Sequence, residues 1–293
     1  EGTSDLLPIK EEVRELFIEK VRMHADNILQ FLSACIENQI SHPEKVFACL
    51  QSWIKYGEIT PEVLANSSLL NACFTHLATD TITEILRCYN KIESDGCVIQ
   101  AMIPLVMSLS ENINVNDLEK ADNVARILTS MGESYMQIIC GPEDIGQEHL
   151  IAVLCKYMKH EDTEISRITL PFWEGLKYYL IDRVKRFKAV DNDGNEMKRI
   201  SDKMRNNFSK YILQVFDVCL VHLNSIINNI NGNEIEEEDC INDFGECVTS
   251  CSLLLDWQPC LVRGFENLTN VLKKAVLDST KNPSENQYTH QMK

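Results

Sequence analysis

The densest group of chemically active side chains is acidic and lies between Glu234 and Glu246. It contains seven carboxylates and no basic residue: Glu234, Glu236, Glu237, Glu238, Asp239, Asp243 and Glu246. Carboxylates at this density attract basic protein partners through long-range electrostatics. They also suit a solvated loop between helices, where they stabilise the N-terminus of the next helix. The residues alone favour the loop, and the protein-binding hypothesis stays open.

Catalytic side chains do not form a recognisable motif. The seven histidines fall outside nucleophile and zinc motifs, and the chain has no GxSxG, P-loop, GxGxxG or HExxH sequence. His76 and His222 fit core or groove positions better than acid–base roles. The turn-rich segments around Gly194 and Gly232 lack the first ligand of an EF-hand. We therefore expect no enzyme activity, no cofactor and no calcium site.

Twelve cysteines are present, and none forms a CxxC pair. Most lie among apolar residues of expected helices, which is typical of reduced, buried thiols in a cytosolic or nuclear protein. Cys247 and Cys251, with Cys240 and Cys260 further out, could in principle bind zinc. The paired short knuckles of zinc sites are missing, so we expect no metal site.

Acidic residues dominate the charge, because 28 Lys and Arg against 44 Asp and Glu give a formal net charge of −16. This balance disfavours nucleic acid as a direct ligand and favours basic protein partners. No apolar run approaches the roughly 20 residues of a membrane span, and no signal peptide opens the chain. We expect a soluble, intracellular section of a longer protein.

One basic region surrounds the turn-rich segment at residues 188–199. It consists of Arg183, Lys185, Arg186, Lys188, Lys198, Arg199, Lys203 and Arg205. Cations near a helix C-terminus are stabilising without any partner. This interpretation is favoured over contact with an acidic partner or with the acidic segment one repeat onward.

Nearly every segment has the 3.6-residue apolar period of an amphipathic helix, and no run alternates as a strand would. Pro43 and Gly57 bound one helix, Thr60 and Pro61 open a short turn, and another helix begins near Asn66. Further helices are expected near residues 8–22, 25–39, 79–91, 97–110, 117–140, 146–159, 163–187, 200–230, 239–256 and 258–279.

The helix expected at 163–187 illustrates the pattern. Asp162 or Thr163 can cap its start, and apolar residues then recur every three or four positions. Pro171 removes a backbone donor and should bend the helix. Trp173 is expected in the core, packed between adjacent repeats.

The expected helices form about six antiparallel pairs, whose lengths overlap the roughly 40 to 47 residues of HEAT or armadillo repeats. Polar interruptions at 188–199 and 228–246 make the spacing irregular. We therefore predict an all-α solenoid of HEAT-type helix pairs, in a single array over residues 1–279. Residues 280–293 are expected to be a polar tail or the edge of the next repeat.

Three stretches resemble the transportin-SR branch of the importin-β (karyopherin) superfamily. They are KVFACLQSWIKYGEITPEVLANSSLL (45–70), NDLEKADNVARILTSMGESYMQIIC (116–140) and HEDTEISRITLPFWEGL (160–176). Each is a helix-packing pattern, and their order and spacing are more specific than any one alone. The resemblance covers most of residues 42–260 and implies a section from the middle of the receptor.

The resemblance implies a non-enzymatic nuclear transport receptor that carries protein cargo through the nuclear pore under the control of the GTPase Ran. Implied partners are Ran, a basic or Arg/Ser-rich cargo and nuclear pore proteins, with no nucleic acid and no membrane. The implied location is both cytoplasm and nucleus. The chain contains no arginine-rich helix to which the family's cargo-reading role could be assigned.

The alternative is a HEAT-repeat scaffold that organises a cytosolic enzyme complex, but the irregular lengths and acidic insertions favour a receptor.

Overall fold

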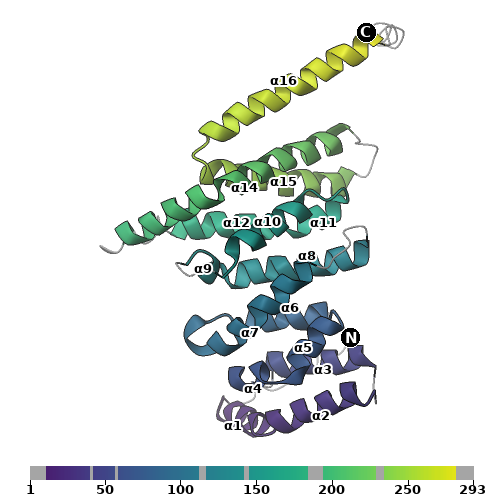
Figure 1. Cartoon of the computed structure of the whole chain (residues 1–293), viewed down its shortest axis with the longest axis vertical. Coiled ribbons are helices and arrows are strands. Elements are labelled where there is room, and N and C mark those ends of the chain that lie inside the picture. Colours follow the sequence, from purple (N-terminus) through teal and green to yellow (C-terminus); the bar gives the residue numbers. More distant parts are fainter. Residues whose placement is uncertain are drawn as a thin grey trace. The chain divides into compact units, whose positions relative to one another are not determined.

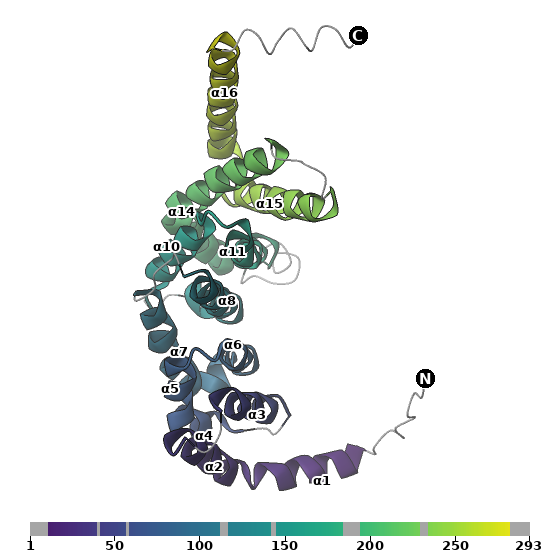
Figure 2. The same cartoon turned by 90° about the vertical axis from the view of Figure 1, so that its right-hand side faces the viewer.

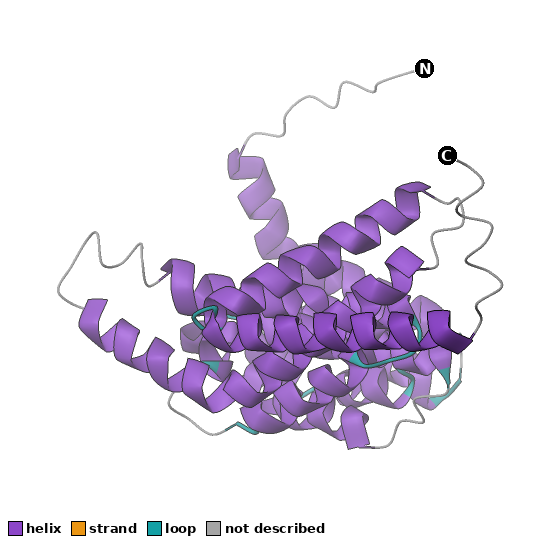
Figure 3. Cartoon of the chain, turned by 90° about the horizontal axis from the view of Figure 1, so that it is seen from above, coloured by secondary structure: helices purple, strands orange, loops and turns teal. Residues whose placement is uncertain are grey.

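The computed structural model describes residues 11–39, 42–56, 59–111, 117–141, 145–183, 194–228 and 234–281. Within these ranges the chain consists of helices and short connections, with no strand (Figure 3). The all-α prediction is confirmed. The helices pack into two compact units, residues 1–150 and 151–293.

The first unit is a stack of helix pairs. Its helices are α1 (Glu11–Arg22), α2 (Ala25–Glu37), α3 (Pro43–Tyr56), α4 (Pro61–Ala65), α5 (Ser68–Thr75), α6 (Thr79–Cys88), α7 (Ile92–Glu111), α8 (Leu118–Ser134) and α9 (Met136–Ile139). In one layer α3, α6 and α8 pack side by side, and in the other α4 and α5 pack against α7 (Figures 1 and 2). Stacking of equivalent helices from successive pairs is the arrangement of an α-solenoid.

The core of the first unit is formed by one apolar stripe from each helix. Leu50, Ile82 and Leu86 are fully buried, as expected for residues that recur at helical spacing. Buried hydroxyls join the layers, since Tyr89 Oη donates to the Ile59 carbonyl at 2.7 Å. This bond satisfies the Tyr89 hydroxyl, whereas Thr129 Oγ1 and Tyr135 Oη are buried in the same unit without a hydrogen-bond partner among the described residues.

The second unit continues the solenoid pattern with longer helices. Its elements are α10 (Gln147–Met158), whose first residues belong to the first unit, α11 (Thr163–Ile168), α12 (Leu170–Lys177), the π-helix η1 (Tyr178–Asp182), α14 (Gly194–Asn228), α15 (Glu234–Leu254) and α16 (Gln258–Lys281). The long helices α14 and α15 form an antiparallel pair, α12 packs on α15, and α16 contacts α14 and α15 (Figure 1). The predicted solenoid fold is confirmed.

The helix expected at 163–187 is divided into three elements. Asp162 is its N-cap, because a side-chain oxygen accepts from the backbone N–H of Glu164 at 2.9 Å. The helix is interrupted at Thr169, two residues before Pro171, whose ring disfavours a continuous helix. Trp173 is fully buried and meets Phe172 edge-on, with ring centroids 5.0 Å apart. The core position predicted for Trp173 is confirmed, whereas the prediction of a single long helix was wrong.

Three helices begin earlier than the sequence indicated. In α7, which starts at Ile92 rather than at 97, the Asp95 carboxylate accepts from the backbone N–H of Lys91 at 2.9 Å and satisfies a donor at the helix start. The helices α14 and α15 begin at Gly194 and Glu234 and include parts of the two segments expected as polar interruptions. Carboxylates are favourable in a first helical turn, which explains why the acidic segment is helical.

One helix passes a length and composition test for crossing a membrane. The 18-residue window Ile92–Leu109 in α7 is sufficiently long and apolar, so the expectation that no such run exists was wrong. Val98, Met102 and Val106 are buried where α7 packs against α4, α5 and α8. A core helix of a soluble protein passes the same test, so this one window is weak evidence for a span.

Candidate protein-interaction surfaces

The acidic segment predicted to bind a partner lies on α15, from its first residue onward. Glu238, Asp239 and Glu246 are exposed on this helix. Side chains of three further predicted residues, Glu234, Glu236 and Glu237, lie outside the described part of the structure. The loop interpretation was therefore wrong for residues 234–246, which are helical.

Asp243 differs from the other predicted acids because it has a partner within the chain. One of its carboxylate oxygens lies 2.7 Å from Nη2 and 3.0 Å from Nε of Arg167 on α11. Arg167 also contacts Glu164 at 3.1 Å. Asp243 thus joins α11 to α15, and its charge is largely offset before any partner arrives.

A groove of about 540 Å³ lies between α12 and α15. Glu174 and Lys177 line it from α12, and Gly245 and Glu246 line it from α15. Lys177 Nζ is 3.1 Å from a carboxylate oxygen of Asp182, so its charge is already paired. The two glutamates therefore set the charge of this groove, which we call the α12–α15 groove.

The electrostatics of Glu174 reflect this environment. Burial raises the pKa of its carboxyl group above the ordinary 4.5, and the nearby charge of Glu246 raises it further. A cation placed between the two carboxylates would relieve their repulsion. The α12–α15 groove is thus suited to a lysine or arginine side chain of a protein partner.

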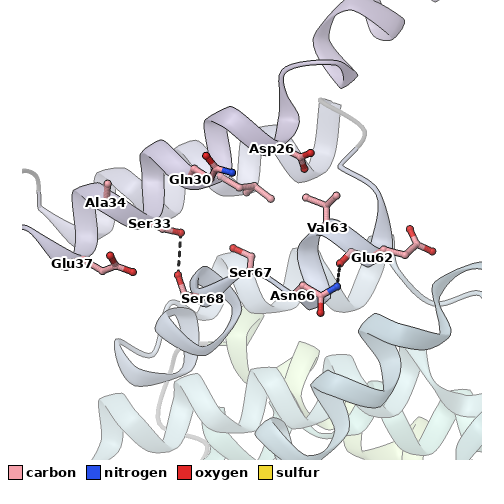
Figure 4. Close-up of a pocket in the computed structure, with 11 residues that line it drawn as sticks. Asp26, Gln30, Ser33, Ala34, Glu37, Glu62, Val63, Asn66, Ser67 and Ser68 are labelled. Carbon is pink, nitrogen blue, oxygen red and sulfur yellow. Dashed lines mark hydrogen bonds between the residues drawn. The ribbon is translucent and has the colours of Figure 1, made fainter.

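A second acidic groove, of about 630 Å³, lies in the first unit between α2 and the α4–α5 pair (Figure 4). Asp26, Glu37 and Glu62 line it, and its described lining contains no basic side chain. Ser68 Oγ donates to Ser33 Oγ at 3.1 Å, which links α5 to α2. Sequence reasoning missed this groove because its three acids come from separate helices with no acidic run.

The basic region divides into residues with different roles. Arg205 is bound to the end of α15 through a bond from Nε to the Leu254 carbonyl at 2.7 Å. Lys198, Arg199 and Lys203 are exposed on the first turns of α14, and residues 185–188 lie outside the described ranges. Because α14 and α15 are antiparallel (Figure 1), the basic start of α14 lies beside the end of α15, away from its acidic start.

His222 has the surroundings of a structural histidine. Its Nε2 lies 3.2 Å from both Ser166 Oγ and the Met158 carbonyl, and its ring stacks on Phe244 with centroids 4.9 Å apart. Burial lowers the pKa of His222 below 6.5. Ser166 is fully buried and donates to the Met158 carbonyl at 2.9 Å, so it is not accessible as a nucleophile.

Three of the core cysteines are buried thiols. Burial raises the pKa of Cys73, Cys140 and Cys155 to about 12, so each is protonated at neutral pH. Among the described residues, no group of three or more His, Cys, Asp or Glu side chains is arranged to hold a metal ion.

Two protein-family models match parts of the chain. The model described as Transportin-3/Importin-13 second TPR domain matches residues 116–191. The model described as Exportin 1-like protein matches residues 6–90. Both describe transport receptors of the importin and exportin type. The matches support the importin-β (karyopherin) superfamily. No curated protein matches the chain.

The karyopherin matches coincide with the stretches that resemble the family. The Exportin 1-like match contains residues 45–70, and the Transportin-3/Importin-13 match contains residues 116–140 and 160–176. Glu174 and Lys177 of the α12–α15 groove lie within a matched range, whereas α15 lies outside both. The acidic face that α15 contributes is therefore a feature of this chain that the karyopherin matches do not cover.

Proposed function

We propose that this chain is a section of a nuclear transport receptor of the transportin-SR branch. The receptor carries a basic or Arg/Ser-rich protein cargo, contacts nuclear pore proteins and shuttles between cytoplasm and nucleus. Binding of Ran in its GTP form controls cargo loading. The observation that carries this proposal is the pair of karyopherin-type matches on one all-α solenoid.

The cargo surface of this section is assigned to the acidic side of α15 and the α12–α15 groove. The predicted residues are Glu234, Glu236, Glu237, Glu238, Asp239, Asp243 and Glu246, to which the structure leads us to add Glu174. A net charge of −16 supports the attraction of a basic partner, and the carboxylates of Glu174 and Glu246 face one groove. Asp243 contributes least, because Arg167 already binds it.

Binding of a fluorescent Arg/Ser-repeat peptide to the purified chain tests the cargo surface. Glu174→Gln combined with Glu246→Gln should weaken binding about tenfold at low salt, because both charges that face the groove are lost. Glu161→Gln, which removes an exposed acid outside the groove, should have a much smaller effect. If the groove variant and the control variant lost the same peptide affinity, the peptide would be responding only to the net charge of the chain.

Blocking the groove without changing its charge provides a second test. A Cβ atom at Gly245 would meet no heavy atom within 4 Å, so Gly245→Leu should leave the fold intact and fill the groove. Gly264→Leu on α16 is a matched control, since its Cβ position is equally open. Gly245→Leu should reduce peptide affinity and Gly264→Leu should not. If both variants bind the peptide normally, the groove is not the cargo site.

Ran control is tested separately with the full-length protein from which this section comes. A pull-down with Ran loaded with GTP or GDP, at two salt concentrations, should show preference for the GTP form. Equal or absent binding would contradict the receptor function. It would leave a HEAT-type scaffold that organises a cytosolic enzyme complex.

A further inference from the structure

The turn between α15 and α16 contains two consecutive residues in the left-handed backbone region. Asp256 has a φ of 56° and Trp257 has a φ of 64°. Aspartate and asparagine enter this region readily, whereas a bulky aromatic residue does so at an energetic cost. The Trp257 side chain is 47% exposed, so burial in a core does not fully offset this cost. The backbone strain is therefore concentrated at Trp257.

Arg205 from α14 holds this turn in place. Its Nε donates to the Leu254 carbonyl at 2.7 Å, and its Nη2 donates to the Leu253 carbonyl at 3.4 Å. Nη2 also lies 2.6 Å from Oδ1 of Asp256. These bonds satisfy the Leu254 carbonyl at the end of α15 and add a second donor to the Leu253 carbonyl, which also accepts from the backbone N–H of Asp256 at 3.5 Å. They also fix the side chain of the residue that precedes Trp257.

Beyond the turn, the first part of α16 packs against the rest of the second unit. Cys260 is buried, and Arg263 Nε is 3.7 Å from a carboxylate oxygen of Asp217 on α14. Four large apolar side chains in the described part of α16 remain more than half exposed: Leu261, Val262, Phe265 and Leu268. A helix that follows such a turn can change its angle by rotation about a few backbone bonds of the turn.

We propose that Asp256–Trp257 is a strained hinge that Arg205 holds closed, so that α16 moves between a closed and an open position. In the closed position, the hydrogen bonds of Arg205 offset the strain at Trp257. In the open position, Trp257 leaves the left-handed region and the apolar face of α16 turns to a new direction. Strain in the closed position lowers the free energy needed for opening.

Hydrogen–deuterium exchange on the whole chain tests whether Arg205 holds the turn between α15 and α16 closed. Arg205→Met removes the hydrogen bonds of Arg205 but keeps an unbranched side chain. It should raise the exchange rate of residues 253–264 about tenfold, with the middle of α14 unchanged. Lys203→Met is the matched control on the same helix, because Lys203 is exposed. An Arg205→Met chain with unchanged exchange at residues 253–264 would overturn the proposal.

Two substitutions at Trp257 test the strain independently of Arg205. Trp257→Asn should slow exchange of residues 253–264 about threefold, because asparagine tolerates the left-handed region. Trp257→Phe keeps a bulky aromatic residue and should exchange as the original chain does. Equal acceleration in both variants would mean that Trp257 contributes contacts rather than strain, and the hinge would be rejected. These two variants decide the question if Arg205→Met fails to fold.

Discussion

The guanidinium of Arg167 lies 2.7 Å from the carboxylate of Asp243, and this ion pair joins α11 to α15. The hydrogen bonds of Asp243, and then those of Glu164, raise the pKa of Arg167 above its ordinary value. The pair is partly exposed, with 26% of the Arg167 side chain and 45% of the Asp243 side chain accessible. It stabilises the packing of α15 and also neutralises one acid of the proposed cargo surface.

Replacing Arg167 by Met should therefore have two opposite effects. The free energy of unfolding should fall by about 1 kcal/mol, because partly exposed ion pairs contribute little. Affinity for the Arg/Ser peptide should rise about twofold to fivefold at low salt, because the charge of Asp243 becomes available. Chemical denaturation and fluorescence anisotropy measure the two effects. Lys156→Met, which removes an exposed lysine of α10, is the control. Weaker peptide binding by the Arg167 variant than by this control would contradict the assignment of the cargo surface.

Trp173 should be the most costly single truncation in the second unit. Trp173→Ala should lower the free energy of unfolding by about 3 to 5 kcal/mol, because a fully buried indole leaves a large cavity. The indole Nε1 is buried without a hydrogen-bond partner. Trp173→Phe should therefore cost less than about 2 kcal/mol, since it also removes an unsatisfied donor. Thermal and chemical denaturation compare the variants, and a loss in Trp173→Phe as large as in Trp173→Ala would contradict this account.

Glu174 should make stability depend on pH in the acidic range. Because its folded-state pKa is raised above 4.5, the folded chain binds more protons than the unfolded chain just above that pH. The contribution of Glu174 to stability should thus decrease as pH rises from about 4.5 through the folded-state pKa. Glu174→Gln should flatten this part of the profile and stabilise the chain at neutral pH. Denaturation midpoints of the original chain and of the Glu174→Gln variant, measured from pH 4 to pH 7, test this. Parallel pH profiles of the two proteins would refute the prediction.

His222 should make stability increase with pH near neutral pH, which is the opposite of the effect expected for Glu174. Its folded-state pKa is lowered below 6.5 by burial, so the unfolded chain binds more protons in this range. Stability should be complete above 6.5 and should fall as pH decreases through the folded-state pKa. His222→Gln should remove this slope, although it also alters the stacking on Phe244. A pH titration of unfolding from pH 5 to pH 8 measures the effect, and an unchanged slope in the variant would exclude His222 as its source.

The local features of the helices followed directly from the residues. The apolar period predicted which faces are buried, Asp162 was one of the two N-caps expected from the sequence, and Trp173 was expected in the core. These features depend on residues only a few positions apart, where helical geometry fixes which side chains share a face. The break before Pro171 was expected only as a bend, because the competition between helix propensity and the proline ring depends on neighbouring packing.

The sequence by itself determined an acidic, all-α solenoid and the position of its acidic run. The tertiary structure decided how the acids are used: Asp243 is bound by Arg167, 76 positions away in the chain, and Glu174 and Glu246 line the same groove. It also placed Arg205 at the end of α15, 49 positions from Leu254. Such pairings depend on how whole helices pack, and the spacing of residues along one helix carries no information about its partner.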